Sequence, residues 1–391
     1  MKRHHIASKA AIGLAALAFH VSSYAINGAE LGGRGVQNTS MGGASIAYPI
    51  DALAAANNPA GILDVPDSAV IDMQYFRGKS SAQFIAPGNT LNNLQTIPVP
   101  EFGVVKHLTP TLAWDIALEA GGAGSDYGRP SLPVPGAANA KSSLKIGDLL
   151  PTIAWRPVPN LNLGASLDIG YEALNVSGVI VPAPVPGGLA PVPSHGTQTA
   201  EGVGVRVGAL WHVTPTFSVG ATYKSRTAMS RLAGYSDDIL AYSNGHLDLA
   251  PEYGVGIAWV HGPVAFAADW LRINWGEISA MQDPNGFHWR NQNVYRAGVS
   301  WDLNPTWTLR AGYSHSDLLF RSAYTAQNLL VPSIGQNAYS IGAAWHVDPK
   351  SDVLLGYEFD PQSTLVGTGA STGTNLTSRV QMFLLGYQYK F

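Results

Sequence analysis

Three histidines, His107, His212 and His346, are the side chains of this sequence best suited by type to general acid–base chemistry. A hydrolytic enzyme would gather such a histidine with a serine and an aspartate, but each of the three stands on a separate segment beside a different proline-containing turn. The zinc-binding spacing His-Glu-x-x-His is missing. Cysteine is absent, which excludes a thiol nucleophile, a disulfide and a thiolate metal site. We therefore expect no enzyme and no metal or other cofactor.

Basic side chains offer a second kind of chemistry, the binding of an anion. Arg206, Lys224, Arg296 and Arg310 each stand among alternating apolar and polar residues. Arginine pairs well with a carboxylate, so these residues could bind the head of a fatty acid. The alternative is that they neutralise acidic side chains on neighbouring strands, and the sequence leaves both interpretations open.

The elements that carry these side chains are segments in which apolar and polar residues alternate. In 306–317, for example, Trp307 and Leu309 share one face while Thr308 and Arg310 share the other. A period of two indicates a β-strand with one apolar face. Fourteen such strands are predicted: 66–77, 99–108, 111–121, 146–157, 160–175, 200–213, 216–226, 250–260, 263–275, 292–303, 306–317, 336–347, 352–360 and 379–391.

The connections between these strands alternate in length. Six are tight and contain proline, and seven are long: 78–98, 122–145, 176–199, 227–249, 276–291, 318–335 and 361–378. Short turns at one end and long loops at the other are typical of an outer-membrane β-barrel. The sequence therefore predicts an all-β protein, a fourteen-stranded antiparallel transmembrane barrel. An even number of strands places both termini at the short-turn end, in the periplasm.

Charged residues fall on one face of the predicted strands, which must then be the lumen. A lysine or arginine facing lipid at mid-membrane would cost roughly 2–4 kcal/mol. Lys106 breaks the pattern, but it lies near a turn, where the cost falls. The predicted inner-face residues are Asp72, Glu101, Asp115, Glu119, Arg156, Asp168, Glu172, Arg206, Lys224, Glu252, Asp269, Arg296, Arg310 and Glu358. Five tryptophans, Trp155, Trp211, Trp259, Trp301 and Trp345, each precede a turn proline by four residues and predict an aromatic girdle.

Residues 1–25 have the features of a secretory signal peptide: a basic start, an apolar run over 10–21 and a small-residue cleavage site at Ser23-Tyr24-Ala25. The leader contains three of the 23 basic residues and no acidic residue, so the mature chain has 20 basic and 26 acidic residues and a net charge of −6. No basic stripe appears, and we expect no nucleic-acid partner. No apolar run of about 18 residues follows the leader, so membrane helices are not expected.

Residues 26–62 lie between the leader and the first strand and lack a strand pattern. They are rich in glycine, and Ser45 to Ala56 predicts a short helix broken at Pro49. Asn58-Pro59-Ala60-Gly61 then predicts a turn or a helix start. Because fourteen strands enclose a lumen wide enough to leak, we expect this segment to fill it as a hatch. An ordinary N-terminal loop is the alternative.

The whole mature chain resembles the outer-membrane fatty-acid transporter family, which includes the toluene and xylene uptake proteins. The resemblance rests on Ser40-Met41-Gly42-Gly43-Ala44, the Asp51-Ala52 stretch, the hatch motif Asn58-Pro59-Ala60-Gly61 and the terminal Phe391. It implies a signal peptide at 1–25, a hatch at 26–62 and a barrel at 63–391. It also implies a monomer in the outer membrane of a Gram-negative cell, in contact with membrane lipid.

The resemblance further implies capture of a hydrophobic ligand between long loops. Its release would follow either movement of the hatch or opening of a gap in the wall at a kinked third strand. In this sequence Gly121, Gly122 and Gly124 would form that wall opening, although they could equally begin a flexible loop. The apolar loops 176–199 and 227–249 suit capture, but also suit packing on each other. The candidate ligand-binding residues are Leu232, Ile239, Leu240, Met382, Leu384, Arg296 and Arg310.

The predicted function is therefore passive uptake of hydrophobic molecules, with long-chain fatty acids as the first expectation. Aromatic hydrocarbons such as toluene or xylene are the alternative ligands for the same fold. A general diffusion porin is a less favoured alternative, because a porin would need an inward-folded loop and no N-terminal hatch.

Overall fold

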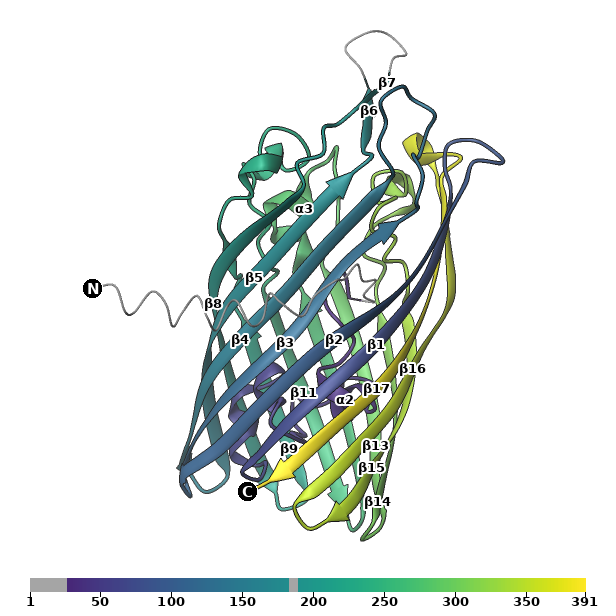
Figure 1. Cartoon of the computed structure of the whole chain (residues 1–391). Helices are drawn as coiled ribbons and strands as arrows, with labels where there is room; N and C mark the ends of the chain where they lie inside the picture. The colour runs from purple at the N-terminus through teal and green to yellow at the C-terminus, as the bar shows by residue number, and fades with distance from the viewer. Residues whose placement is uncertain (1–26, 183–188) are drawn as a thin grey trace, which may run out of the picture.

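A computed structural model describes residues 27–182 and 189–391, so the predicted signal peptide at 1–25 lies outside the described residues. In the described part of the chain, fourteen long antiparallel strands form a closed barrel (Figure 1). These strands are β1 (Ser68–Gln83), β2 (Thr90–Thr109), β3 (Leu112–Asp126), β4 (Lys141–Val158), β5 (Leu161–Ser177), β8 (Thr197–Thr214), β9 (Phe217–Lys224), β11 (Glu252–His261), β12 (Val264–Ile273), β13 (Gln292–Asn304), β14 (Trp307–Ser316), β15 (Asn337–Asp348), β16 (Ser351–Val366) and β17 (Asn375–Lys390).

The predicted strand order is confirmed, because each long strand pairs with its neighbours in the sequence. The barrel closes where β1 pairs with β17, in a register that runs from Ser68–Lys390 to Gln83–Asn375. Three short strands lie near the long loops: β6 (Ile180–Pro182), β7 (Leu189–Pro191) and β10 (Ala228–Met229). No helix among the described residues is long and apolar enough to cross a membrane.

The lengths of several loops were predicted wrongly. The predicted loop 78–98 is mostly strand, and only 84–89 joins β1 to β2. Likewise, 127–140 and 367–374 replace the longer predicted loops 122–145 and 361–378. The strand ends near these loops carry polar residues on both faces, so the backbone pairs there without the apolar alternation that marks a strand in lipid. The six tight connections are confirmed as two-residue turns.

The predicted inner and outer faces are confirmed. The five girdle tryptophans are exposed, and Lys106 is exposed near the turn end, with its amine 5.9 Å from the centre of the Phe391 ring. All the predicted inner-face charges are buried except Arg156 and Arg310, which are half-buried. The strands therefore place apolar side chains toward lipid and charges toward the lumen.

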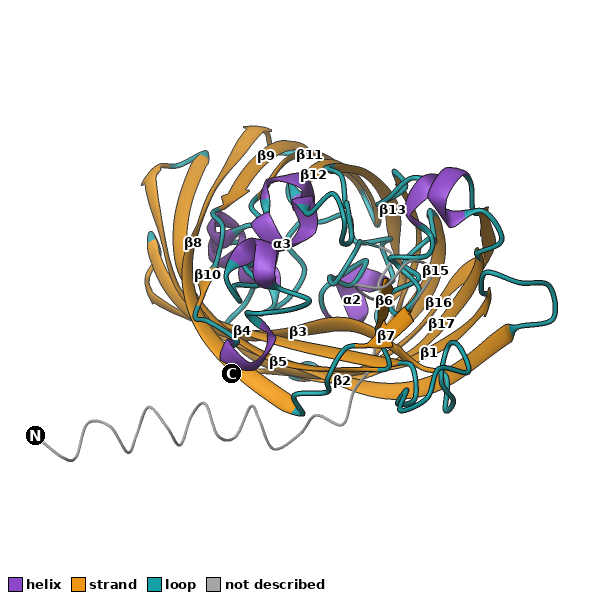
Figure 2. Cartoon of the chain, turned by 90° about the horizontal axis from the view of Figure 1, so that it is seen from above, coloured by secondary structure: helices purple, strands orange, loops and turns teal. Residues whose placement is uncertain are grey.

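The inner segment, which we define as residues 27–63, lies inside the barrel toward the tight turns (Figures 1 and 2). It contains α2 (Gly35–Thr39), η1 (Ala54–Ala56) and η2 (Pro59–Leu63). The helix predicted over 45–56 is wrong except for η1. The physical reason is that the backbone N–H groups of Ser45 and Ile46 are held by a wall carboxylate, Asp269, rather than by helical carbonyls.

Short helices lie in the connections at the loop end: α3 (Ser279–Gln282), η3 (Ala233–Tyr235), η4 (Ala241–Ser243), η5 (Trp275–Glu277), η6 (Ser322–Tyr324) and η7 (Gly369–Ser371). Seen from above, several of these helices and loops turn inward over the lumen (Figure 2). The loops thus cover one end of the barrel, while the inner segment occupies the space nearer the other end.

Candidate functional site

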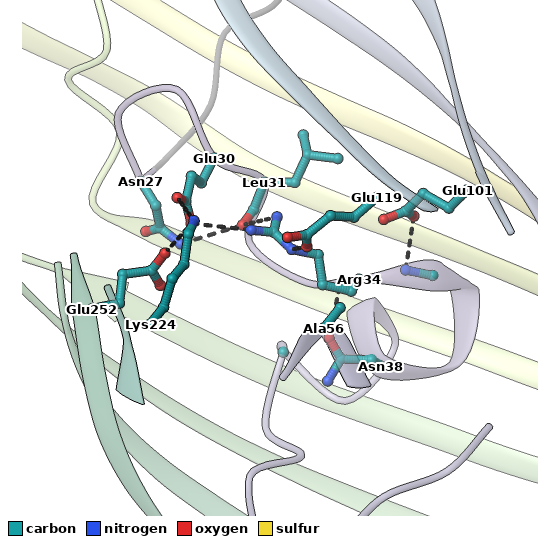
Figure 3. Close-up of polar contacts among 12 residues, drawn as sticks. Asn27, Glu30, Leu31, Arg34, Asn38, Ala56, Glu101, Glu119, Lys224 and Glu252 are labelled. Carbon is teal, nitrogen blue, oxygen red and sulfur yellow. Dashed lines mark hydrogen bonds and ion pairs between the residues drawn. The ribbon is translucent and has the colours of Figure 1, made fainter. Parts of the chain in front are cut away.

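A network of buried ions joins the inner segment to the wall (Figure 3). Arg34 pairs with Glu30 at 3.0 Å and also with Glu119 of β3. Arg206 of β8 pairs with the same Glu119 at 2.9 Å and with Asp168 of β5 at 3.3 Å, and it donates to the carbonyl of Ala56. The charges compensate one another across three strands and two parts of the inner segment, so none of these basic groups is left to bind a free carboxylate.

Lys224 of β9 forms a second junction, between Glu30 and Glu252, at 2.9 Å to each carboxylate (Figure 3). Burial by itself raises the pKa of Glu30, but Lys224 and Arg34 outweigh it and hold the pKa of this carboxyl below its ordinary value. Glu30 therefore stays ionised and fastens the first turn of the inner segment to the wall.

Wall carboxylates also satisfy the backbone of the inner segment. Glu101 accepts from the N–H of Gly35 at 2.8 Å, and Asp72 accepts from the N–H of Val36 at 2.7 Å, at the start of α2. Asp269 accepts from two N–H groups of the 45–46 turn, at 2.7 and 3.0 Å. Buried backbone donors need partners, so these acids fix the course of a segment that has little regular structure of its own.

Asn58 of the predicted hatch motif joins three parts of the structure. Its amide donates to the carbonyls of Ile46 at 2.8 Å and of Ala209 on β8 at 3.1 Å, while its side-chain oxygen accepts from the N–H of Ala60 at 3.1 Å. The last contact is an N-cap, with Pro59 at the first position of η2. The predicted helix start is confirmed, and a single side chain also ties it to the wall.

The wall accommodates the inner segment through inward-facing glycines. A Cβ at Gly208 would collide with the Asn58 side chain, and one at Gly312 would collide with the backbone of Gly42. Four of the cross-strand pairs that face the inner segment consist of glycine on both strands: Gly164–Gly208, Gly220–Gly256, Gly298–Gly312 and Gly342–Gly356. Each of these eight residues would collide with the inner segment or a neighbouring wall group if it had a side chain. The wall and the segment are therefore shaped for each other.

The three histidines hold polar contacts at the turn end and do not form a catalytic group. His107 contacts Asp67 at 2.8 Å, His212 contacts Asp64 at 2.9 Å and His346 contacts Asp352 at 2.7 Å. Asp64 and Asp67 belong to the short link between the inner segment and β1, and Arg156 also pairs with Asp64, at 2.6 Å. The link is thus fastened to three strands.

Residues 369–373 have the Gly-x-Ser-x-Gly spacing that surrounds the nucleophilic serine of many hydrolases. In the structure, the Ser371 hydroxyl is buried and donates to the carbonyl of Ala323 at 2.8 Å. None of the hydrogen bonds described for it involves a histidine. Ser371 therefore joins two loops.

Between β2 and β3, the ladder ends although both strands continue toward the loop end. Their pairing stops at Phe102–Leu118, although β2 continues against β1 and β3 continues against β4. We call this unpaired stretch the seam; it lies between β2 residues 90–101 and β3 residues 119–126. The predicted glycines lie along it, and β3 runs through them as a strand, so they do not begin a flexible loop.

The sequence explains why the seam stays unpaired. Pro98 and Pro100 of β2 have no N–H to donate to a neighbouring strand. Gly122 and Gly124 of β3 have φ angles of 150° and 154°, which favour glycine, and side chains there would collide with β4 carbonyls. The N–H of Gly122 instead donates to the carbonyl of Ala29 at 2.9 Å, so the start of the inner segment lies against the gap.

A buried apolar cluster occupies the loop end of the lumen. Trp275 and Trp289 meet edge to face at 5.2 Å, and Ala29 and Ala123 extend the same cluster to the seam. Other members are Leu174, Met229, Leu232, Tyr235, Leu240, Leu271, Ile278, Met281, Phe320 and Leu329. Ile239 packs on this cluster and, with Val176, Val179 and Val192, lines a small apolar crevice beneath the loops. Continuous apolar packing thus runs from the loops to the seam.

The predicted ligand-binding residues fall into two separate places. Leu232, Ile239 and Leu240 meet in the apolar cluster at the loop end. Met382 and Leu384 pack instead in a lower apolar cluster with residues of the inner segment. Arg296 donates to the carbonyl of Gly43 at 3.3 Å, and Arg310 lies within electrostatic reach of Tyr48 and Asp51. The structure does not bring the two arginines together with the loop-end residues.

Sequence reasoning missed Pro98, Pro100 and Glu30. The prolines were assigned to the end of a loop or the start of a strand, yet two prolines at alternate positions are a recognisable sign of a strand that cannot pair on one side. Glu30 had no local signal, because its partner Lys224 is 194 residues away.

Together these features define a class: a transmembrane β-barrel with an occupied lumen, an apolar cluster beneath its loops and a break in its wall. A family profile described as outer membrane protein transport protein (OMPP1/FadL/TodX) matches residues 10–250 and 275–391. The chain belongs to this family of outer-membrane proteins that transport hydrophobic compounds. It is a channel and not an enzyme.

Solved structures share this fold at low sequence identity. The Pseudomonas putida toluene transporter TodX has a TM-score of 0.69 and 17% identity, covering 93% of this chain and 99% of that one. A Pseudomonas aeruginosa FadL homologue has a TM-score of 0.73 and 16% identity, with 93% and 100% covered. The Ralstonia pickettii toluene transporter TbuX has a TM-score of 0.66 and 18% identity, with 93% and 99% covered. A search of curated proteins found no match.

Proposed function

We propose that this protein passively admits small, neutral hydrophobic molecules and releases them sideways through the seam. The observation that carries the proposal is the continuous apolar packing from the loops to Ala29 and Ala123, which ends where β2 and β3 are unpaired. A ligand captured beneath the loops would need to displace only the first turn of the inner segment, where the carbonyl of Ala29 covers Gly122. Water and ions would still meet the filled lumen below.

In this proposal, residues 26–62 act as a hatch that keeps the lumen closed, and 63–391 form the barrel. The tight turns and both termini face the periplasm, and the long loops face outward, because the loop end holds the apolar crevice suited to capture. The protein works as a monomer, since the first and last strands, β1 and β17, pair with each other and leave no open end of the sheet for a partner. The ion contacts of Arg34 with Glu119 and of Asp64 with Arg156 keep the rest of the hatch inside the barrel during transport.

The pairing of the lumen cations favours a neutral ligand over a fatty acid. Arg206 and Lys224 are each held between two carboxylates. Arg296 and Arg310 lie beside the inner segment, away from the loop-end cluster. The names of the similar structures also include toluene transporters. Long-chain fatty acids, the first expectation from the sequence, are the alternative ligand for the same route.

Uptake by reconstituted liposomes tests the ligand. We expect the protein to accelerate entry of labelled toluene, with no competition from an excess of oleate, because the side chains that form the apolar cluster carry no charge to compensate a carboxylate. Arg296→Gln and Arg310→Gln should leave toluene uptake unchanged. Protein-free liposomes set the background. Oleate uptake that disappears in either arginine variant would favour the fatty-acid alternative, and entry of glucose as fast as toluene would favour a porin.

Closing the seam should slow release. Replacing Pro98 and Pro100 by valine restores two N–H donors to β2 and favours its pairing with β3, so we expect toluene uptake to fall several-fold while the barrel stays folded. Pro361→Val is the matched control, because Pro361 also lies inside a barrel strand, β16, which is separated from β2 by β1 and β17. Unchanged uptake in the P98V/P100V variant, with new β2 amide protection seen by hydrogen exchange, would exclude the seam as the exit.

A further inference from the structure

Where the barrel closes, acidic side chains lie on the inner face of the wall and basic side chains lie on its outer face. On the four neighbouring strands β2, β1, β17 and β16, every acidic residue points inward and is buried: Asp72, Glu101, Asp352, Glu358 and Asp360. Toward the loop end of the same strands, Arg77, Lys79 and Arg379 are exposed on the outer face. None of these three cations has an ion pair among the described residues. The outer surface there carries positive charge without an acidic neighbour on its own or the adjacent strands.

Two of the cations stand directly opposite each other. Lys79 of β1 is the register partner of Arg379 of β17, and both point outward. Arg77 lies two residues before Lys79 on β1 and points to the same face. Like charges at such positions are about 5 Å apart at Cβ and destabilise a sheet unless an anion lies between them. The guanidinium of Arg379 is also held in place, 5.1 Å from the centre of the Phe359 ring. The arrangement therefore has the form of an anion site that lacks an anion from the protein itself.

The position of the three cations along the barrel axis places them relative to the membrane boundaries. Ala69, paired with the girdle residue Tyr389, marks the turn-end boundary of the membrane. Lys79 is ten residues further along β1, which is about 33 Å of strand. For a tilt of about 40°, this corresponds to ~25 Å along the barrel axis, the height of the apolar band of an outer-membrane barrel. Outward-facing Tyr75 and Phe383 come just before the cations, as an aromatic girdle would. The cations thus lie at the level of lipid headgroups.

We propose that Arg77, Lys79 and Arg379 form a binding site for the phosphate of a lipid headgroup in the outer leaflet. Phosphate fits because it carries enough charge for three cations and enough oxygens for the arginine forks. A lipid source fits because the three side chains lie on the lipid-facing wall, at the boundary where headgroups are concentrated. The inference rests on the orientation proposed above, with the long loops outward, and it assigns a lipid-contact site outside the transport route.

The test measures lipid retention by the full mature chain. The probe is lipid A, a phosphorylated glycolipid, retained by detergent-purified protein and counted by native mass spectrometry. Because each basic residue near an anionic lipid surface contributes measurably to binding, we expect the triple variant Arg77→Gln, Lys79→Gln, Arg379→Gln to weaken lipid A binding by roughly tenfold or more. Chemically dephosphorylated lipid A should bind the unmodified protein as weakly as lipid A binds the variant.

The matched control removes two exposed cations at the opposite boundary, Lys106→Gln and Lys350→Gln, and should retain lipid A. The substituted positions in each variant are on the outer face or in a turn, so the barrel ladders are untouched, and resistance of the folded band to unfolding in detergent gels verifies this. Inorganic phosphate that displaces lipid A at equal concentration would indicate a free-ion site and overturn the proposal, as would equal retention by the triple variant and the control. Toluene uptake is measured separately. The lipid A binding result can therefore be interpreted even if the transport proposal fails.

Discussion

Removal of residues 27–63 should raise the ionic conductance of the barrel by about tenfold or more, toward that of an open pore. The expectation follows from size, because barrels of about eight strands are filled by their own side chains whereas those of about sixteen leave a water channel. In this barrel of fourteen strands, the wall residues facing the inner segment include eight paired glycines that contribute no side chain to the lumen. Planar-bilayer recording of the full and shortened chains measures the change.

The deletion is informative because the wall has its own ladders and does not depend on the segment for backbone pairing. Replacement of Gly312 by valine gives a second variant in which the segment is displaced without being removed, since a side chain there collides with Gly42. Gly262→Val, in an exposed turn with nothing nearby, is its control, although its φ of 58° adds local strain. If the shortened barrel folds but conducts no better than the full chain, the inner segment does not close the pore.

Arg206→Met should destabilise the folded protein by about 3–5 kcal/mol, because it leaves buried carboxylates without their compensating charge. Glu119 and Asp168 are both within 3.3 Å of this guanidinium and are almost completely buried. Replacing the whole group, with Arg206→Met, Glu119→Gln and Asp168→Asn together, should recover much of the loss, because the two carboxylates that Arg206 compensated are then neutral and Arg34 still pairs with Glu30. Urea unfolding followed by tryptophan fluorescence measures the free energies.

The control for this series is Arg226→Ala. Arg226 pairs with Asp248 at 3.4 Å, but its side chain is 55% exposed, and exposed ion pairs contribute about 0–1 kcal/mol. Equal losses for Arg206→Met and Arg226→Ala would mean that the buried network does not fasten the inner segment to the wall. A triple variant as unstable as Arg206→Met alone would place the cost in packing rather than in charge.

The strands and their faces could be predicted because the signal is local. A single strand shows which side chains meet lipid, and Trp307, Leu309 and Arg310 suffice to orient β14. Asn58 was likewise recognisable, since an asparagine before Pro59 is a local helix-start signal. Such inferences need only neighbours in the sequence, which is why the number and order of the strands were correct while their polar ends were not.

The contacts that define the site could not be predicted, because they join distant parts of the chain. The seam is a missing pairing between two strands, and the composition of either strand alone does not fix where their ladder ends. The course of the inner segment is set by wall groups such as Asp269, which override the helix that residues 45–56 would favour. The choice of ligand depends on which cations are already paired, and the partners of Arg206 and Lys224 are 28 to 194 residues away.

The paired wall glycines have a consequence for the order of assembly. The ladders of the barrel can form without the inner segment. The segment, in contrast, depends on wall groups for its backbone hydrogen-bond partners and for its conformation. We therefore expect the segment to settle last, after insertion and closure of β1 against β17. Substitutions within it should delay this final step without preventing insertion, so newly inserted barrels would pass through a brief, leaky stage.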